Sequence, residues 1–379
     1  MSLTYFIIVS AKEGKNMSDS EKHLFFMQKA LDMAHEAKGT TFPNPAVGAV
    51  IVSHNRVIAH GATEKCGGKH AEIVALHQAG DNARGSTLYV TLEPCCHHGR
   101  TSPCIDSIIS HGIKRVFVAM EDPNPLVQGK SIKILQNEGI EVNVGLLATE
   151  ATRLNEDFLW DITQKKAWIT LKLALTLDGK IADYKGDSKW ITSSQSREFV
   201  QLLRKRHAAV GVGITTLQMD DPKLTARCEK TFFPARIVFS PDETLPANSF
   251  FIRNASQVRS VVVLRGGEQR IETSSDGVEL WHTGEKDPLR SLHSFVAMAH
   301  QQHLSSILIE GGQRLGSLFL QAGLVNRIYL FYGNKILGRG KEGLLFSSGL
   351  SIDKCITLEN TEHLVFGSDI MITGKPVLS

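Results

Sequence analysis

The sequence predicts an α/β protein with two domains. The chain has 379 residues, and a single hydrophobic core stops growing at about 250–300 residues. Short β-branched runs alternate with segments of helical apolar spacing between residues 18 and 147, which is the pattern of a layered α/β domain. A second series of strand and helix patterns opens at Trp168.

The predicted elements of the first half begin with a helix. Ser18 and the acidic residues after it supply helix-start chemistry, and apolar residues recur at helical spacing as far as about Gly39. Two β-branched runs on either side of Ser53-His54-Asn55 indicate a hairpin. The elements that follow are expected at 70–79 (helix), 86–91 (strand), 94–95 (start of a helical turn), 105–110 (helix), 115–119 (strand), 131–137 (helix), 140–144 (strand) and 148–161 (connecting helix).

The predicted elements of the second half begin with a strand over residues 168–174. It runs into Leu177-Asp178-Gly179-Lys180, whose aspartate-glycine pair is typical of a turn. The remaining elements are expected at 194–207 (helix), 209–213, 234–240 and 259–264 (strands), 289–300 (helix), 305–310 (strand), 315–322 (helix), and 326–337 and 364–373 (terminal strands).

Composition is that of an ordinary soluble globular protein, with 42% hydrophobic and 21% charged residues. The net charge of +3 is too small to predict a nucleic-acid or membrane partner. No run of about 18 apolar residues exists that would predict a transmembrane helix. Three of the six cysteines cluster near one histidine, which favours metal binding in the reducing cytoplasm over a disulfide framework.

The start of the chain is expected to lie outside the fold. Residues 4–9 are apolar, but the run is too short for a secretory signal and has no basic region before it. Met17 is a second plausible start. Residues 1–17 are therefore interpreted as a leader or an added extension.

The most informative motif is His70-Ala71-Glu72, followed by Pro94-Cys95 and Cys104. Zinc takes nitrogen and sulfur ligands tetrahedrally, and a catalytic zinc site keeps one position for water. The metal lowers the pKa of that water toward neutrality. Glu72 can then move protons from the water to a departing amine, as in the zinc deaminase signature. His70, Cys95 and Cys104 are thus predicted zinc ligands.

A purely structural zinc site is the alternative interpretation of this motif. Eight residues separate Cys95 from Cys104, more than the two of the nucleoside deaminase pattern, and Cys96, His97 and His98 in between could be rival ligands. A structural site usually has four ligands at short regular spacing. The carboxylate of Glu72 would have no purpose there, so the motif favours a catalytic site.

The second half carries weaker signals. Glu310-Gly311-Gly312 leaves a strand and enters a helix, where glycines and free amides could receive a phosphate. The full dinucleotide fingerprint is missing, so a tight strand–helix connection is about as well supported. Basic residues near strand ends, such as Lys172, Arg204 and Arg227, could equally be solvated surface charges.

Several stretches in both halves share a pattern with one family. In the first half they are Pro43-Asn44-Pro45-Ala46-Val47-Gly48, His70-Ala71-Glu72, Thr91-Leu92-Glu93-Pro94-Cys95, Gly99-Arg100-Thr101, Cys104 and Asp122-Pro123-Asn124-Pro125. In the second half they are Lys172-Leu173-Ala174, Leu177-Asp178-Gly179-Lys180, Trp190-Ile191-Thr192-Ser193, Asp220-Asp221-Pro222-Lys223-Leu224-Thr225, Arg227 and Glu310-Gly311-Gly312. With these stretches, the chain closely resembles the bifunctional deaminase-reductases of riboflavin biosynthesis from about Glu21 to its end.

The resemblance implies a fold and two reactions. Residues 18–147 would form a cytidine-deaminase-like three-layer α/β/α domain, 148–166 a linker helix, and 167–379 a dihydrofolate-reductase-like α/β domain. The first domain would use zinc to remove an amino group from 2,5-diamino-6-(5-phosphoribosylamino)pyrimidin-4-one by hydrolysis. The second would use NADPH to reduce the ribosyl group, giving 5-amino-6-(5-phosphoribitylamino)uracil. A homo-oligomer, either a dimer or a tetramer, is also expected.

The resemblance also implies roles for single residues. His70, Cys95 and Cys104 would bind zinc, Glu72 would be the catalytic proton shuttle, and Cys96 would be a packed thiol. The deaminase substrate would contact Asn44 and Asp122. The reductase substrate would contact Lys172, Ser188, Arg204, Leu224, Arg227 and Glu310, with the two arginines as phosphate clamps. NADPH would contact Ala174, Trp190, Thr216, Asp220, Gly311 and Gly312.

Two other functions use the same motifs. A zinc-dependent nucleic-acid base deaminase with an appended nucleotide-binding domain would need a basic, aromatic-lined groove. The net charge of +3 and the 7% aromatic content give that alternative little support. A non-catalytic zinc protein whose second half only binds a nucleotide is the other alternative.

Overall fold

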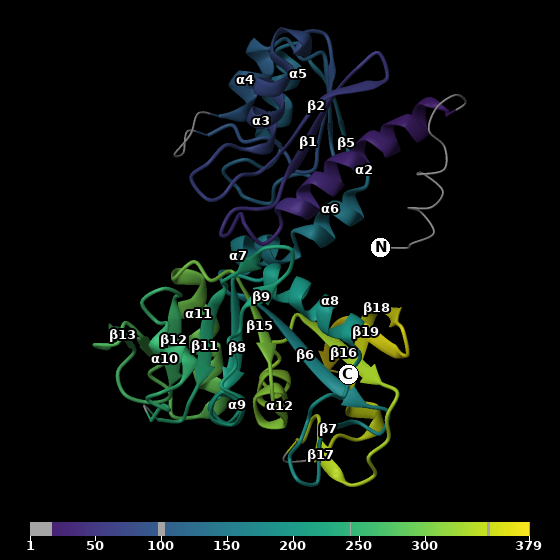
Figure 1. The fold of residues 1–379 in the computed structure, drawn as a ribbon. Coiled ribbons are helices and arrows are strands. Elements are labelled where there is room, and N and C mark those ends of the chain that lie inside the picture. The colour runs from purple at the N-terminus through teal and green to yellow at the C-terminus, as the bar shows by residue number, and fades with distance from the viewer. Residues whose placement is uncertain (1–16, 98–102, 243, 347–348, 379) are drawn as a thin grey trace. The chain divides into compact units, whose positions relative to one another are not determined.

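The computed structural model describes residues 17–97, 103–242, 244–346 and 349–378. The chain divides into two compact units between Thr163 and Gln164, and Figure 1 shows strands flanked by helices in each. Residues 1–16 of the predicted leader lie outside the described residues, as do His98 and Gly99-Arg100-Thr101. Among the helices that the structure describes, none is long and apolar enough to cross a membrane.

The first unit is built on a five-stranded sheet. Its elements are β1 Gly48–Ser53, β2 Arg56–Ala62, β3 Thr87–Val90, β4 Arg115–Val118, β5 Glu141–Val144, α2 Asp19–Ala37, α3 Ala71–Ala79, α4 Cys104–Ser110, α5 Lys130–Asn137 and α6 Ala148–Leu154. The strand order is β2-β1-β3-β4-β5, with β3, β4 and β5 parallel and the other pairs antiparallel. One core joins α2 and α6 to one face of the sheet, and another joins α3, α4 and α5 to the opposite face (Figure 1). The predicted three-layer arrangement is confirmed.

Local sequence signals explain the first helix and the hairpin. Ser18 and Glu21 form a capping box at the start of α2, in which each side chain accepts a hydrogen bond from the other residue's amide. His54 and Asn55 have left-handed backbone angles, with φ of 49° and 60°. Such angles let a short turn join β1 and β2 with the right twist.

The structure corrects the helical turn that was predicted at 94–95. Cys95 lies in an irregular segment after β3, and helix α4 begins only at Cys104. Pro103 caps this helix, so the proline that precedes the helix is Pro103 and not Pro94. Of the three predicted zinc ligands, two therefore lie at helix starts and Cys95 lies in a loop.

The predicted connecting helix over 148–161 is divided into α6 and α7 (Glu156–Gln164) by Asn155. The Asn155 side chain is fully buried; its Oδ1 accepts from the Ala46 amide at 3.0 Å and its Nδ2 donates to the Ala46 carbonyl at 2.9 Å. Asparagine side chains that bond to backbone groups favour helix ends over helix interiors. A buried ion pair of 2.5 Å between Lys38 and Asp157 lies next to it in sequence. Both contacts fix the segment that contains Asn44.

Asn155→Ala is expected to lower the free energy of unfolding of the first unit by about 2–4 kcal/mol, because the buried amide and carbonyl of Ala46 would lose their partners. Urea unfolding of the full chain at fixed zinc concentration measures this. The matched control is Asn143→Ala, which removes an exposed amide that bonds to Glu141 and should change stability by less than about 0.5 kcal/mol. Equal losses in the two variants would contradict the role given to Asn155.

The second unit is built on a ten-stranded sheet. Its elements are β6 Trp168–Thr176, β8 Ala209–Gly213, β11 Ala235–Phe239, β12 Ser260–Leu264, β13 Arg270–Thr273, β14 Glu279–His282, β15 Ser306–Glu310, β16 Arg327–Gly333, β18 Ile356–Phe366, β19 Asp369–Leu378, α8 Ser194–Lys205, α9 Ile214–Asp220, α10 Phe250–Arg253, α11 Pro288–Gln301 and α12 Gln313–Gln321. The order is β13-β14-β12-β11-β8-β15-β6-β16-β19-β18. The seven strands from β14 to β16 are parallel. One core lies against α11 and α12, and another against α8, α9 and α10, so the predicted α/β class of this half is confirmed.

The end of the chain differs from its prediction. The single strand expected over 364–373 is a hairpin of β18 and β19, which turns at Gly367 with φ of 63°. β18 has only exposed and half-buried residues. Its sequence therefore lacks the apolar run of a buried strand, and the strand was not recognised. Short elements such as β7 (Lys180–Asp183), β9 (Ala226–Arg227), β10 (Thr231–Phe232) and β17 (Gly340–Glu342) were also not predicted, because two to four residues carry no periodicity.

Candidate active sites

The three predicted zinc ligands meet at one edge of the first sheet. His70 caps α3, Cys104 opens α4, and Cys95 lies in the loop that follows β3. The His70 Nδ1 atom lies 3.2 Å from the Cys104 sulfur and 3.5 Å from the Cys95 sulfur. The Cys104 amide donates to the Cys95 sulfur at 3.3 Å, which holds the loop against the helix start.

This triad fits a zinc ion. Tetrahedral zinc with bonds of about 2.0–2.3 Å separates a nitrogen from a sulfur ligand by about 3.5 Å, and the three ligand atoms here all lie within 4.8 Å of one another. Within the described residues no other cysteine, histidine or carboxylate joins the group. Cys96, one of the rival ligands, directs its sulfur to the Leu126 carbonyl at 3.8 Å. Three protein ligands are the number that catalytic zinc sites use.

The charges of the triad are also suited to a metal. A hydrogen bond from the Cys104 thiol, assisted by His70, lowers the pKa of Cys95 to about 4. The same hydrogen bond and burial raise the pKa of Cys104. The bond to Cys95 raises the pKa of His70. The site therefore holds one thiolate and protons that a metal would displace, since zinc binds deprotonated ligands.

Glu72 lies in the first turn of α3, beside the triad. Its side chain is buried, and this burial, together with the negative charge of Cys95, raises its pKa to about 7. Glu72 is also within hydrogen-bonding reach of the Cys104 thiol. A carboxyl group with a pKa near neutrality can both accept and return a proton, which is the chemistry that the sequence assigned to Glu72.

Asn44 and Asp122 belong to the same edge of the sheet. Asn44 precedes β1. Because β1 runs antiparallel to β2 and β3, its start lies beside the ends of both strands, and the chain continues from the end of β3 to Cys95. Asp122 follows β4, is buried, and is close enough to Cys95 for their charges to interact. Burial, and to a smaller extent the charge of Glu93, raises the pKa of Asp122. The topology thus places Asn44, ahead of β1, and Asp122, after β4, at the edge of the sheet that carries the metal ligands.

Glu93 is a buried residue to which the sequence analysis gave no role. Its carboxylate accepts three backbone hydrogen bonds of 3.0–3.2 Å, from the amides of Asp122, Gly129 and Ser131. These bonds fix the loop that carries Asp122. The sequence signal was a charged residue between a buried strand and a metal ligand, in Thr91-Leu92-Glu93-Pro94-Cys95.

In the second unit, three predicted substrate contacts form a charge cluster in which Glu310 is buried and Lys172 and Arg204 are half-buried. Glu310, the last residue of β15, pairs in register with Lys172 of β6. Arg204 of α8 forms a forked ion pair with Glu310, at 2.5 and 2.9 Å, and donates to the Thr225 carbonyl at 3.1 Å. The Arg204 fork is thus occupied by a carboxylate, whereas the sequence analysis expected it to clamp a phosphate.

Burial controls the electrostatics of this cluster. It lowers the pKa of Lys172, and Glu310 only partly offsets it. Burial also opposes ionisation of Glu310, but the charge of Arg204, its hydrogen bonds and the nearby Lys172 and His207 together outweigh it and lower the pKa of Glu310. Burial therefore disfavours the charge of Lys172, and any charge that it carries acts through a low dielectric, where its field on a neighbouring group is stronger than in water.

The predicted glycine turn lies where two neighbouring strands end. β8 and β15 are adjacent and parallel, so the loops after them meet at one edge of the sheet, where α/β proteins bind ligands. Gly311 has φ of 142°, and a side chain there would lie 3.5 Å from the Thr216 hydroxyl and 4.0 Å from the Gly213 amide. Gly312 caps α12 and no side chain accepts from that cap. The backbone angle of Gly311 favours glycine, and the start of α12 at Gly312 has no side-chain cap in the described residues, which suits the binding of an anion.

The loop between β7 and α8 carries Ser188 and Trp190. Lys189, between them, forms an ion pair of 3.4 Å with Asp220 at the end of α9. Trp190 is 60% exposed, and the Arg197 guanidinium lies 4.4 Å from its ring centre. This loop therefore places an aromatic ring, a hydroxyl and Asp220 in one region of the second unit.

The three remaining predicted residues differ in accessibility. Ala174 is half-buried and lies on the same face of β6 as Lys172. Leu224 is only 2% exposed and belongs to a core, so its backbone and not its side chain is available to a ligand. Arg227 is exposed, and its amide donates to Gln201 of α8, the helix that carries Arg204.

Two family models match the chain, one for each unit. Residues 167–372 match the RibD C-terminal domain. Residues 20–120 match the cytidine and deoxycytidylate deaminase zinc-binding region. The second match contains the three metal ligands and Glu72, and the first contains Lys172 and Glu310.

Several proteins are similar to the chain over most of its length. The riboflavin biosynthesis protein RibD of Aquifex aeolicus is 45% identical over 355 residues, which cover 92% of this chain and 97% of that protein. The protein of the same name from Escherichia coli is 37% identical over 339 residues, covering 86% and 91%. The crystal structure of a diaminohydroxyphosphoribosylaminopyrimidine deaminase/5-amino-6-(5-phosphoribosylamino)uracil reductase from Thermotoga maritima is 35% identical, with a TM-score of 0.82 over 95% of this chain and 100% of that one. Acinetobacter baumannii RibD gives a TM-score of 0.83 at 34% identity with the same coverage.

Proposed function

The chain belongs to the RibD family, the bifunctional deaminase-reductases of riboflavin biosynthesis, and we propose which of its residues carry the two activities. Its first unit is a zinc-dependent deaminase that acts on the diaminopyrimidine ribotide, and its second is an NADPH-dependent reductase that acts on the ribosyl group. The substrate is thus a small molecule.

In the deaminase, His70, Cys95 and Cys104 hold the zinc ion and Glu72 moves the protons. Zinc supplies a Lewis acid that makes water a nucleophile near neutral pH. Glu72 takes a proton from the attacking water and delivers it to the departing amine, which leaves as ammonia. Asn44 and Asp122 read the edge of the pyrimidine with an amide and a carboxyl group. The buried position of Glu72 next to the triad supports this assignment.

In the reductase, Lys172 polarises the sugar and the glycine turn holds the cofactor. NADPH supplies a hydride when bound. Gly311, Gly312 and Thr216 contact its phosphates, while Ala174, Trp190 and Asp220 line the rest of its site. Glu310 holds Lys172 in place from the adjacent strand, and Arg204 keeps Glu310 ionised. Ser188, the Leu224 backbone and Arg227 contact the substrate, with Arg227 as the free guanidinium for its phosphate.

The observation that carries the proposal is the meeting of His70, Cys95, Cys104 and Glu72 at one sheet edge. Incubation of the full chain with the diaminopyrimidine ribotide, zinc and NADPH tests it. Mass spectrometry should show replacement of an amino group by an oxo group, followed by gain of two hydrogens. Absence of the first product in the presence of zinc would overturn the deaminase assignment. Absence of the second would overturn the reductase assignment.

Partners and location follow as further proposals. The chain forms a homo-oligomer, a dimer or a tetramer, acts in the cytoplasm and has no nucleic-acid partner. The small net charge supports the absence of a nucleic-acid partner, and the free cysteines support a reducing compartment; the oligomer rests on the resemblance alone. Ammonia release from RNA oligonucleotides, measured beside release from the ribotide, would reveal a nucleic-acid deaminase. Light scattering of the purified chain gives the oligomeric state, and a monomer would contradict the proposal.

Glu93→Gln is expected to weaken deamination through the position of Asp122. The amide offers one acceptor oxygen in place of two, and its NH₂ group would face backbone donors that now bond to the carboxylate. We expect kcat/KM for deamination to fall by about 10- to 100-fold, with KM carrying most of the change and zinc content unaltered. The control is Glu138→Gln, on the exposed end of α5. Loss of zinc together with activity would show that Glu93 supports the metal site instead of the loop.

A further inference from the structure

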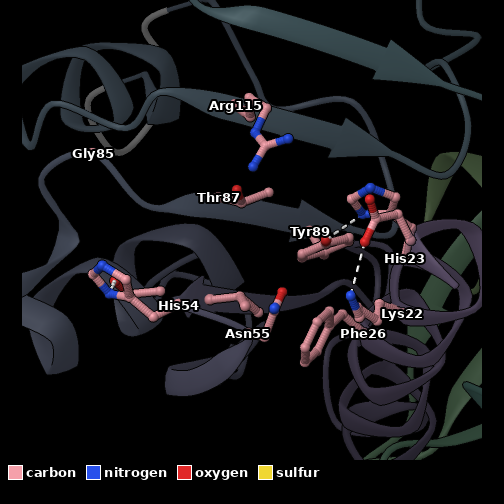
Figure 2. A pocket seen from close by; sticks show the side chains of 12 residues that line it. Lys22, His23, Phe26, His54, Asn55, Gly85, Thr87, Tyr89 and Arg115 are labelled. Atoms are coloured by element: carbon pink, nitrogen blue, oxygen red, sulfur yellow. Dashed lines mark hydrogen bonds and ion pairs between the residues drawn. The ribbon is translucent and has the colours of Figure 1, made fainter. Parts of the chain in front are cut away.

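A pocket in the first unit lies apart from both candidate active sites. It has a volume of about 370 Å³, within the range of small-molecule sites, and Figure 2 shows the side chains around it. Four segments line it: the first turns of α2, the turn between β1 and β2, and the starts of β3 and β4. Cys95 follows the other end of β3, so this pocket and the zinc triad lie at opposite edges of the sheet.

The pocket contains an arginine that forms no ion pair within the described residues, although the charge of Asp19 lies close enough to interact with it. Arg115, the first residue of β4, is half-buried, and its side chain makes no ion pair or hydrogen bond within the described residues. In Figure 2 its guanidinium extends toward Thr87. Glu141 is its neighbour in the ladder, but that carboxylate accepts a hydrogen bond from Asn143. A guanidinium that is turned into a hollow is suited to a phosphate, whose oxygens match its fork.

A second cation faces the same pocket. Lys22 of α2 is 30% exposed and pairs at 2.8 Å with Asp19, whose side chain is 89% exposed. Such an exposed pair contributes little energy, so Lys22 can exchange Asp19 for a ligand at small cost. Lys22 and Arg115 project toward the pocket from different elements (Figure 2), which would place positive charge on two sides of one anion.

The rest of the lining mixes polar groups with Phe26 and Val52, and His23 is held by two contacts. His23 stacks on Phe117 with ring centres 4.3 Å apart and bonds to the Tyr89 hydroxyl at 2.6 Å. Burial lowers the pKa of His23, so this ring adds a hydrogen-bonding group and not a third charge. Asn55 and Thr87 add an amide and a hydroxyl (Figure 2). These groups match the hydroxyls of a sugar or polyol better than an apolar ring.

We propose that this pocket binds a small sugar phosphate, with the phosphate between Arg115 and Lys22 and the hydroxyls near Asn55 and Thr87. The pocket is separate from the deaminase and reductase sites, and the proposal does not depend on the residue roles assigned there. No covalent step takes place in it.

Titration of the full zinc-loaded chain with ribose 5-phosphate, followed through the ring resonance of His23, tests the proposal, because His23 lines this pocket and a calorimetric signal would also include binding at the two active sites. Arg115→Gln is expected to weaken binding by about 10- to 100-fold. Lys133→Gln, which removes one exposed charge from α5 in the same unit, should leave the affinity unchanged. Inorganic phosphate should bind at the same place but more weakly than the sugar phosphate, because it lacks the hydroxyls.

A second variant and the spectroscopic signal keep the test independent of folding. Asn55→Gly keeps the left-handed turn but removes the amide, and it should weaken ribose 5-phosphate binding while leaving inorganic phosphate binding unchanged. Ribose 5-phosphate should shift the ring resonance of His23 in histidine-labelled protein. Unaltered affinity in Arg115→Gln, or the absence of a His23 shift, would place the ligand elsewhere and overturn the proposal.

Discussion

Glu72→Gln is expected to reduce deamination by about 10²- to 10⁴-fold, the range that a positioned proton-transfer group contributes. The amide keeps the size of the side chain and can still fill the buried position at the start of α3. It cannot take a proton from water or deliver one to the departing amine. Zinc should stay bound, because His70, Cys95 and Cys104 are unchanged.

Three measurements on one preparation make this result specific. Ammonia release from the diaminopyrimidine ribotide gives the loss, the zinc content gives the state of the metal site, and NADPH oxidation with the deaminated ribotide reports the second unit. The control is Glu150→Gln, an exposed residue of α6. A Glu72→Gln protein that keeps zinc and deaminates at the wild-type rate would remove Glu72 from the mechanism.

Lys172→Met is expected to reduce NADPH oxidation by about 10²- to 10³-fold, the cost of removing one group that stabilises developing charge in a low-dielectric site. Methionine fills a similar volume but carries no charge. The ion pair of Arg204 with Glu310 remains, so the variant leaves no uncompensated carboxylate and should fold. The loss should appear in kcat more than in KM for NADPH, because the predicted cofactor contacts are on other residues.

The deaminase activity of the same variant is the internal control. Lys354→Met, which removes an exposed lysine from the second unit, should leave both activities unchanged. If Lys172→Met lowered deamination and reduction by the same factor, Lys172 would have only a structural role. An unchanged rate of NADPH oxidation would assign the polarising role to another group.

The zinc site was largely predictable because its signals are local in the sequence. His70 and Glu72 belong to one helix start, and the type of each ligand indicates a metal before any fold is known. The position of Cys95 in a loop was not predictable, because it depends on the hydrogen bond from the Cys104 amide to its sulfur. Glu93 was missed for a similar reason: its partners are backbone amides of a loop that is distant in sequence.

The reductase site was predictable only through the resemblance. Lys172 and Glu310 are far apart in the chain, and they meet because β6 and β15 pair in a register that no local pattern determines. The same holds for Arg204, which was predicted as a phosphate clamp and which pairs with Glu310 in this structure. Asn155 divides a segment that reads as one helix, because a buried tertiary contact with Ala46 outweighs helical periodicity.

The dependence of ammonia release on zinc content tests the central claim most directly. Chelation of the full chain should abolish deamination of the diaminopyrimidine ribotide, and added zinc should restore it in proportion to the metal bound at His70, Cys95 and Cys104. NADPH oxidation with the deaminated ribotide should stay constant throughout. Ammonia release that persists in metal-free protein would contradict the account.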